Sequence, residues 1–107
     1  MIRINRKLIL DENSIIYIDH YGRQSFIHTV DGVFSVYMTT KSVIEKLPDN
    51  FIHINKALYV NKDFIARIEG CKYELKNGEI LYGAIRKAGF HRRLNKEMKG
   101  ILFIKKR

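Results

Sequence analysis

The segment Phe51-Ile-His-Ile-Asn-Lys-Ala-Leu-Tyr-Val-Asn61 carries most of the information on the fold of this 107-residue chain. Apolar residues recur through it and culminate in Leu58 to Val60, which predicts extended structure from residue 51 to residue 60. His53, Asn55 and Lys56 interrupt this pattern, so we expect their side chains to project together from one stretch beside buried residues. In an arbitrary β protein, such polar side chains would simply face water. Residues outside the segment must therefore distinguish a binding site from a solvated strand.

Alternating apolar residues on both sides of this segment predict further strands. Asp31-Gly32 and Asn77-Gly78 each lie between two such runs and predict hairpins closed by type I′ turns. A short helix is expected between a threonine cap at position 39 or 40 and Pro48, and helical spacing returns from Ile85 to about Leu94. The chain is thus predicted to be mainly β with short helices.

Length and composition favour one small cytoplasmic domain that spans residues 1–107. The hydrophobic fraction of 46% suits a globular core, and no apolar run approaches the roughly 20 residues of a membrane helix. The apolar stretch behind the first basic residues, Leu8 to Leu10, is too short for a signal peptide. The single cysteine, Cys71, permits no internal disulfide, which fits a reducing compartment.

The net charge of +9 is concentrated at the C-terminal end of the chain. Residues 1–82 carry 11 basic and 10 acidic side chains, a balance of +1, whereas residues 83–107 carry 9 basic and 1 acidic, a balance of +8. We predict a basic C-terminal tail from about residue 95 to residue 107. Such an excess attracts nucleic acid or an anionic membrane surface, and a solvated helix face is the alternative.

The sequence gives no local signature of catalysis or metal binding. The four histidines, His20, His28, His53 and His91, are scattered, without a second histidine or cysteine at metal-ligand spacing. The glycines are dispersed among turns and form no phosphate-binding loop. We therefore expect no enzyme, no metal and no cofactor.

The order of motifs from residue 8 to about residue 94 resembles the LytTR DNA-binding domain, the output domain of bacterial response regulators. That family shows an aromatic residue, Arg-x-His-Arg/Asn-Ser, an apolar triplet ending in Val-Asn, an isoleucine, an Asn-Gly-type hairpin, and a strand closing on an arginine. This chain presents, in the same order, Phe51, His53-Ile54-Asn55-Lys56-Ala57, Leu58-Tyr59-Val60-Asn61, Ile65, Asn77-Gly78, and Tyr82 to Arg86.

The resemblance implies an elongated stack of small β-sheets with short helices, whose loops enter successive major grooves of double-stranded DNA. It also implies a set of DNA-binding residues in three loops: Tyr21, Arg23 and Gln24; His53, Asn55 and Lys56; and Arg86 with Lys87. The chemistry agrees for the cations, because arginine and lysine can contact the O6 and N7 acceptors of guanine. Gln24 could read adenine, whereas His53 and Asn55 are expected to make backbone or water-mediated contacts.

Four positions depart from the family pattern. His53 replaces an arginine, Asn55 a histidine, Ala57 a serine, and Ile85 the serine that often precedes the final arginine. Two hydroxyl groups directed at phosphates are thereby lost, and one permanent cation becomes titratable.

We interpret the chain as the DNA-binding domain of a bacterial transcription regulator. By resemblance, two copies would bind repeated half-sites, and a receiver domain would precede the domain in a longer response regulator. The first alternative is a small RNA-binding or ribosome-associated β domain that stacks bases on exposed residues such as Tyr21, Tyr37 or Tyr73. The second is an interaction module whose basic tail binds acidic proteins or membranes.

Overall fold

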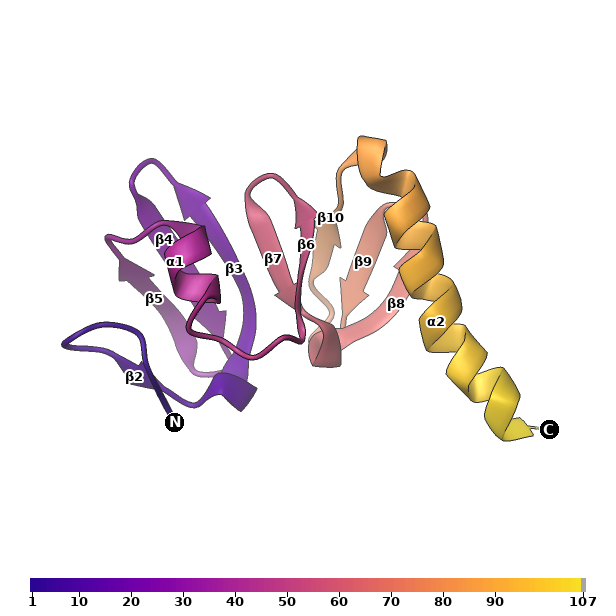
Figure 1. The fold of residues 1–107 in the computed structure, drawn as a ribbon, viewed down its shortest axis with the longest axis horizontal. Helices are drawn as coiled ribbons and strands as arrows, with labels where there is room; N and C mark the ends of the chain where they lie inside the picture. The colour runs from indigo at the N-terminus through magenta and orange to yellow at the C-terminus, as the bar shows by residue number, and fades with distance from the viewer. Residues whose placement is uncertain (107) are drawn as a thin grey trace. The chain divides into compact units, whose positions relative to one another are not determined.

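The structure is a computed structural model that describes residues 1–106, with side chains described for residues 1–99 (Figure 1). It is mainly β, with several small sheets and short helices, as the sequence predicts. The chain divides into two compact units, Met1–Asp63 and Phe64–Arg107, which we describe in turn.

A five-stranded antiparallel sheet forms the centre of the first unit. Its order is β5-β4-β3-β7-β6. The strands are β3 (Ile15–Tyr21), β4 (Gln24–Thr29), β5 (Gly32–Val36), β6 (Phe51–Asn55) and β7 (Leu58–Asn61). β3 and β7 are joined by pairing Tyr17 with Val60 and Ile18 with Tyr59. The sheet therefore joins a three-stranded meander, β3-β4-β5, to the β6–β7 hairpin through the pairing of β3 with β7.

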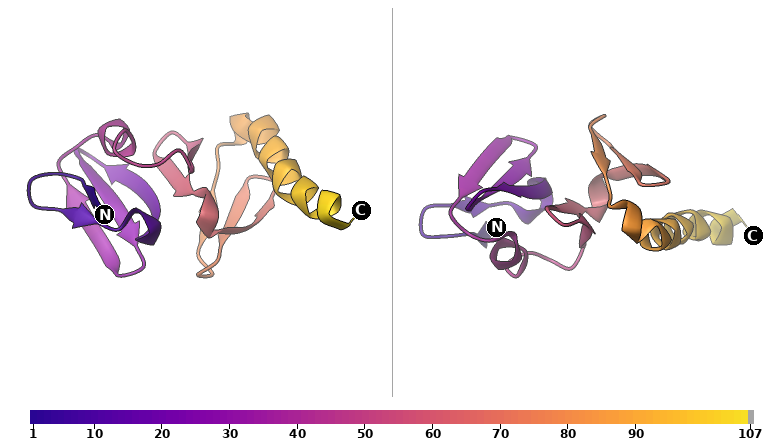
Figure 2. Two further views of the ribbon diagram at one scale, coloured as in Figure 1. Left: turned by 60° about the horizontal axis from the view of Figure 1, so that its bottom comes forward. Right: turned by 90° about the horizontal axis from the view of Figure 1, so that it is seen from above.

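Shorter elements complete the first unit, and Leu10 and Val43 from two of them pack into its hydrophobic core. These elements are β1 (Ile2–Arg3) and β2 (Ile9–Leu10), which pair with each other, η1 (Glu12–Ser14), and α1 (Thr40–Ile44). Thr39 caps α1, because its hydroxyl accepts a hydrogen bond from the Ser42 amide at 3.1 Å. Figure 2 shows α1 lying over the sheet, where Val43 joins Ile18 and Ile27 in the hydrophobic core.

The buried side chain of Asn61 makes three hydrogen bonds near the end of the first unit. Its amide Nδ2 donates to the carbonyl of Ile15 at 2.8 Å, a contact between the ends of β7 and β3. Its Oδ1 accepts from the Asp63 amide at 2.9 Å and from Asn50 Nδ2 at 2.8 Å. The bond from the Asp63 amide begins the 3-10 turn η2 (Lys62–Phe64).

The second unit is a three-stranded meander followed by a helix. The elements are β8 (Ile65–Glu69), β9 (Lys72–Leu75), β10 (Ile80–Tyr82), the 3-10 turn η3 (Ile85–Lys87) and α2 (Ala88–Lys106). α2 docks on the sheet through Leu94 and His91, which are 5% and 0% exposed. The predicted basic tail falls in the second half of α2, but residue 107 and the side chains from residue 100 lie outside the described residues.

Both nitrogens of the buried His91 ring are engaged. Nε2 lies 2.9 Å from the Ala84 carbonyl, and Nδ1 lies 2.6 Å from the Tyr73 hydroxyl. Because a carbonyl can only accept, a neutral ring carries its proton on Nε2 and accepts from Tyr73 at Nδ1. A Cβ atom at Gly83 would run into the same ring, so the chain passes His91 at a distance that only glycine allows.

Three sequence predictions need correction. The hairpins at Asp31-Gly32 and Asn77-Gly78 are present, but the type I′ turns are wrong, because neither Asp31 nor Asn77 has a positive φ. The second hairpin instead has a three-residue loop, in which the Gly78 amide bonds the Leu75 carbonyl and Gly78 takes the positive φ, 89°. The extended structure predicted over residues 51–60 is interrupted by a turn at Lys56-Ala57. Helical structure continues past the predicted end near Leu94.

Tyr73 should make the stability of the second unit sensitive to alkaline pH. Burial, together with the nearby Cys71 thiol, raises the pKa of the Tyr73 phenol well above its ordinary value of 10.0. A raised pKa in the folded state favours the neutral phenol, so this contribution is complete below about pH 10 and is lost as the pH rises further. Urea unfolding between pH 8 and 11 should therefore show a smaller alkaline loss of stability for Tyr73→Phe than for the wild-type chain. Equal losses would contradict this role, and Tyr82→Phe, which changes an exposed tyrosine, is the control.

Candidate nucleic-acid interface

Two hairpin turns of the first unit lie at the same end of the five-stranded sheet. β3 runs antiparallel to β7, with Ile18 opposite Tyr59, so the end of β3 lies beside the beginning of β7. The β3–β4 turn at Gly22-Arg23 and the β6–β7 turn at Lys56-Ala57 consequently project in one direction (Figure 1). The centres of the two hairpins are two strand spacings apart, about 10 Å. The register alone therefore brings two of the three sequence-predicted loops together.

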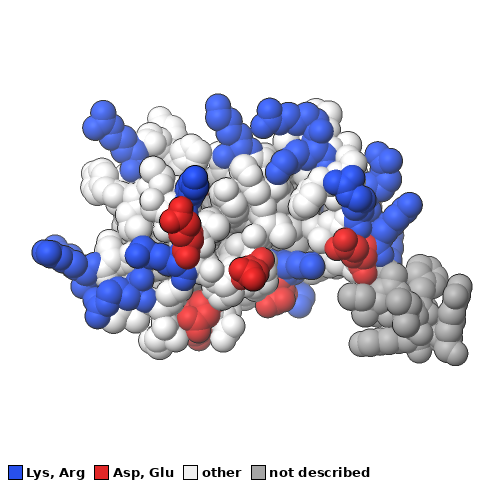
Figure 3. All heavy atoms as spheres, in the orientation of Figure 1, with Lys and Arg blue, Asp and Glu red and all other residues white. Residues whose placement is uncertain are grey.

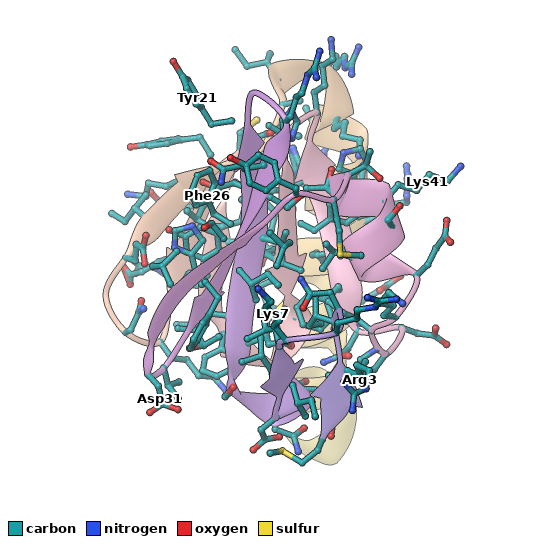
Figure 4. The ribbon with its side chains drawn as sticks, turned by 90° about the vertical axis from the view of Figure 1, so that its left-hand side faces the viewer. Arg3, Lys7, Tyr21, Phe26, Asp31 and Lys41 are labelled. Atoms are coloured by element: carbon teal, nitrogen blue, oxygen red, sulfur yellow. The ribbon has the colours of Figure 1, made fainter. Side chains whose placement is uncertain are left out.

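The β3–β4 turn presents Tyr21 and Arg23 to solvent, whereas Gln24 is half-buried. Tyr21 and Gln24 pair across the end of the hairpin, and Arg23 lies exposed between them. Tyr21 is 83% exposed, and Figure 4 shows it extending from the end of the sheet that lies opposite Asp31. This turn can offer a guanidinium, an amide and a phenol to a ligand at once.

The β6–β7 turn is built by two of the predicted site residues. Asn55 Oδ1 accepts a hydrogen bond from the Ala57 amide at 2.9 Å, which closes the turn around Lys56. The His53 ring stacks on Tyr59 with centroids 4.3 Å apart, and its Nε2 lies 3.4 Å from the Lys56 carbonyl. These contacts hold the turn, while the Lys56 ammonium remains exposed at its tip.

Arg86 and Lys87 belong to the second unit, where η3 follows β10. Arg86 is exposed, whereas Lys87 is half-buried and places its ammonium 5.3 Å from the centre of the Phe90 ring. Further cations follow on α2, and Figure 3 shows blue side chains around its first half. The exposed cations of α2 among the described side chains are Arg92, Arg93, Lys96 and Lys99.

The sequence analysis did not name these α2 cations as site residues, and it named Tyr37 only as a stacking candidate for RNA. The charge excess of residues 83–107 was the signal in the sequence for the α2 cations, and the alternation of apolar residues before Thr39 was the signal for Tyr37. Tyr37 is 81% exposed and follows β5, whose register continues Tyr21 and Gln24 into one cross-strand row. Tyr73, a stacking candidate for RNA, is fully buried.

The histidines do not assemble into a site for a metal ion. His28 packs against Tyr17 and lies 2.9 Å from Asp19, His53 supports the β6–β7 turn, and His91 is buried under α2. Over the part of the chain that the structure describes, no three histidine, cysteine or acidic side chains are grouped for metal binding. In the same part, no helix combines the length and the apolarity that a membrane crossing requires.

Exposed cations on the turns of the five-stranded sheet in the first unit, and on α2 in the second unit, are typical of the class of basic β domains that bind polyanions. Within this class, residues 5–100 match the family model of the LytTr DNA-binding domain. The chain therefore belongs to the LytTR family of DNA-binding domains.

A solved structure shows the same fold. It is the LytTr DNA-binding domain of a protein described as a methyl-accepting/DNA response regulator from Bacillus cereus. The match covers 79% of this chain and 84% of that chain, with a TM-score of 0.69 and 18% sequence identity. A comparison with curated proteins gave no significant match.

The structural role of Asn55 can be tested separately from binding. Asn55→Ala removes the acceptor for the Ala57 amide and should lower the free energy of unfolding by about 1 kcal/mol in urea titrations. Asn55→Asp keeps an acceptor and should lose less. Lys56→Ala, at the exposed tip, should change stability by less than about 0.5 kcal/mol. Equal stability of Asn55→Ala and the wild-type chain would show that the turn does not depend on this side chain.

Proposed function

We propose that this chain is the sequence-specific, double-stranded DNA-binding domain of a bacterial transcription regulator, acts in the cytoplasm and has no enzymatic activity. The match of residues 5–100 to a DNA-binding family carries this proposal. The exposed cations on the two turns of the first unit support it with chemistry. The two units would act together as one domain across residues 1–107, with the positive end of the chain, from about residue 95, adding contacts that are independent of sequence.

In this proposal, the two turns of the first unit contact one major groove. Their separation of about 10 Å is compatible with a groove about 12 Å wide. Arg23 and Lys56 would contact guanine edges, Gln24 would read adenine, and Tyr21 would contact the sugar-phosphate backbone. Arg86, with Lys87 beside it, would enter the next groove from the second unit.

His53 and Asn55 would act mainly by positioning the Lys56 turn. The hydrogen bond from the Ala57 amide to Asn55 and the stacking of His53 on Tyr59 support this assignment. Where family members carry a permanent cation, this chain carries an imidazole whose Nε2 lies beside the Lys56 carbonyl. We therefore assign these two side chains to the shape of the loop and to backbone or water-mediated contacts.

The structure gives less support to RNA recognition. Base stacking needs exposed aromatic faces, and Tyr73 is buried with its hydroxyl bonded to His91. Tyr21 and Tyr37 are exposed at the sheet end that carries the cationic turns, where a phenol can also contact the sugar-phosphate backbone of duplex DNA, and the match to a DNA-binding family favours DNA. We propose double-stranded DNA as the ligand, bound by two copies on repeated half-sites, with a receiver domain as the partner that regulates it.

Lys56 and Lys62 allow a matched test of the DNA-facing end, which is the end of the five-stranded sheet that carries the Arg23 and Lys56 turns. Both lysines are exposed, and they flank β7 at opposite ends. Lys56→Ala should weaken binding to a selected DNA site by about 1 to 3 kcal/mol, roughly 5- to 150-fold in Kd, in fluorescence anisotropy. Lys62→Ala should stay within about threefold of the wild-type chain. Equal losses for both variants would contradict a DNA-facing end.

Arg86 should determine the preferred base at one position. In a randomised-DNA selection, Arg86→Ala should lose the preference at one base pair while the remaining positions of the site persist. Arg67→Ala removes an arginine that pairs with Glu74 at 3.3 Å in the same unit and should leave the selected site unchanged. A selected site identical for Arg86→Ala and the wild-type chain would refute base reading by Arg86.

A further inference from the structure

The edge strand β5 lacks the charged residues, the proline and the bulge that often protect a sheet edge. β5 ends the order β5-β4-β3-β7-β6, with β4 as its hydrogen-bonded neighbour. Edge strands in natural proteins usually carry lysine, proline or a bulge that prevents pairing with another strand. Residues 32–40, Gly-Val-Phe-Ser-Val-Tyr-Met-Thr-Thr, contain no charged residue and no proline, in a chain of net charge +9. The pairing of β4 with β5 also runs without a register shift.

The side chains along this edge are unusually apolar for an exposed strand. Val33 is 57% exposed and Tyr37, directly after the strand, is 81% exposed, with the exposed Ser35 between them on the same face. On the opposite face, the half-buried Phe34 and the buried Val36 contact the hydrophobic core. β5 therefore offers an apolar strip on its outer face and an extension of the core on its inner face.

This strip is complementary to itself. A twofold axis perpendicular to the sheet pairs two β5 strands antiparallel and keeps each face of the sheet continuous. With Ser35 on the axis, Val33 of one copy lies opposite Tyr37 of the other on the outer face. On the inner face, Phe34 lies opposite Val36. Both pairs join an aromatic side chain to a β-branched one, a combination that stabilises antiparallel strands.

The charges at the two ends of the strip favour the same arrangement. Asp31 precedes β5 and Lys41 follows the uncharged run, and Figure 4 shows these two residues well apart on the first unit. Antiparallel pairing brings the acidic end of one copy near the basic end of the other. Parallel pairing would bring like charges together.

We infer that β5 is an interface through which two copies of this chain pair antiparallel across a twofold axis at Ser35. The two five-stranded sheets then form one continuous sheet. This pairing uses backbone groups of the β5 edge and does not depend on DNA. Because the axis turns the Arg23 and Lys56 ends of the two copies in opposite directions, it is separate from the binding of two copies to repeated half-sites.

The mass of the full chain in solution tests this interface. Sedimentation equilibrium at about 0.15 M salt, from micromolar protein to about 1 mM, should show a mass rising from 12.6 kDa towards twice that value. Ser35→Lys places two ammonium groups opposite each other on the axis and should keep the chain monomeric. Ile9→Lys adds the same charge at another exposed position of the first unit and should still pair. A monomer throughout for the wild-type chain, or pairing retained by Ser35→Lys, would overturn the inference.

Cysteine cross-linking tests the register independently of affinity. In a Cys71→Ser background, Ser35→Cys places two thiols on the axis with Cα atoms about 5 Å apart, within disulfide range. Oxidation should therefore link two copies. Val33→Cys is the matched control, because its two copies lie four residues apart along the strands, about 13 Å, and should not link with themselves. Absence of the Ser35→Cys link, or equal linking of Val33→Cys, would overturn the register. DNA-binding measurements on Ser35→Lys separate this result from the proposed function, since a monomer can still bind a half-site.

Discussion

The pairing of β3 with β7 is the constraint on which the first unit depends. It joins strands about 40 residues apart along the chain through two registered pairs, and the buried amide of Asn61 adds a bond to the Ile15 carbonyl. A slip of one residue would turn the apolar side chains of β7 to the wrong face. The same register places the Arg23 and Lys56 turns at one end of the sheet. The packing of the core in the first unit and the placement of the Arg23 and Lys56 turns therefore both depend on the pairing of β3 with β7.

Local chemistry explains which parts of this fold could be predicted from sequence. Glycine-containing turns, the Thr39 cap and the Asn61 cap act within a few residues, so their signals are visible in the chain. The Lys56-Ala57 turn was missed because it contains no glycine or proline and is closed by the Asn55 side chain. The type I′ turns were wrong because Asp31 and Asn77 keep negative φ values. Pairing between distant strands, such as Tyr17 with Val60, leaves no local signal.

The binding role of the candidate site residues remains a prediction, and the structure bears only on their exposure and contacts. Exposure of Tyr21, Arg23, Lys56 and Arg86 agrees with their expected projection from turns, and the resemblance supplied their order. The supporting contacts of His53 and Asn55 could not be predicted, since stacking on Tyr59 depends on the β6–β7 register. Two of the four positions that differ from the family pattern, His53 and Asn55, thus contact the Lys56 turn in this chain. Sequence identifies which groups are present, and strand register determines which of them meet.

The close passage of Gly83 past His91 limits how this chain can evolve. A methyl group at position 83 would displace the imidazole that bonds both the Ala84 carbonyl and the Tyr73 hydroxyl. A side chain at residue 83 therefore requires the His91 ring to shift, which would disturb both of these hydrogen bonds. Positions 73, 83 and 91 are coupled in this way, so a change at position 83 acts on the other two residues.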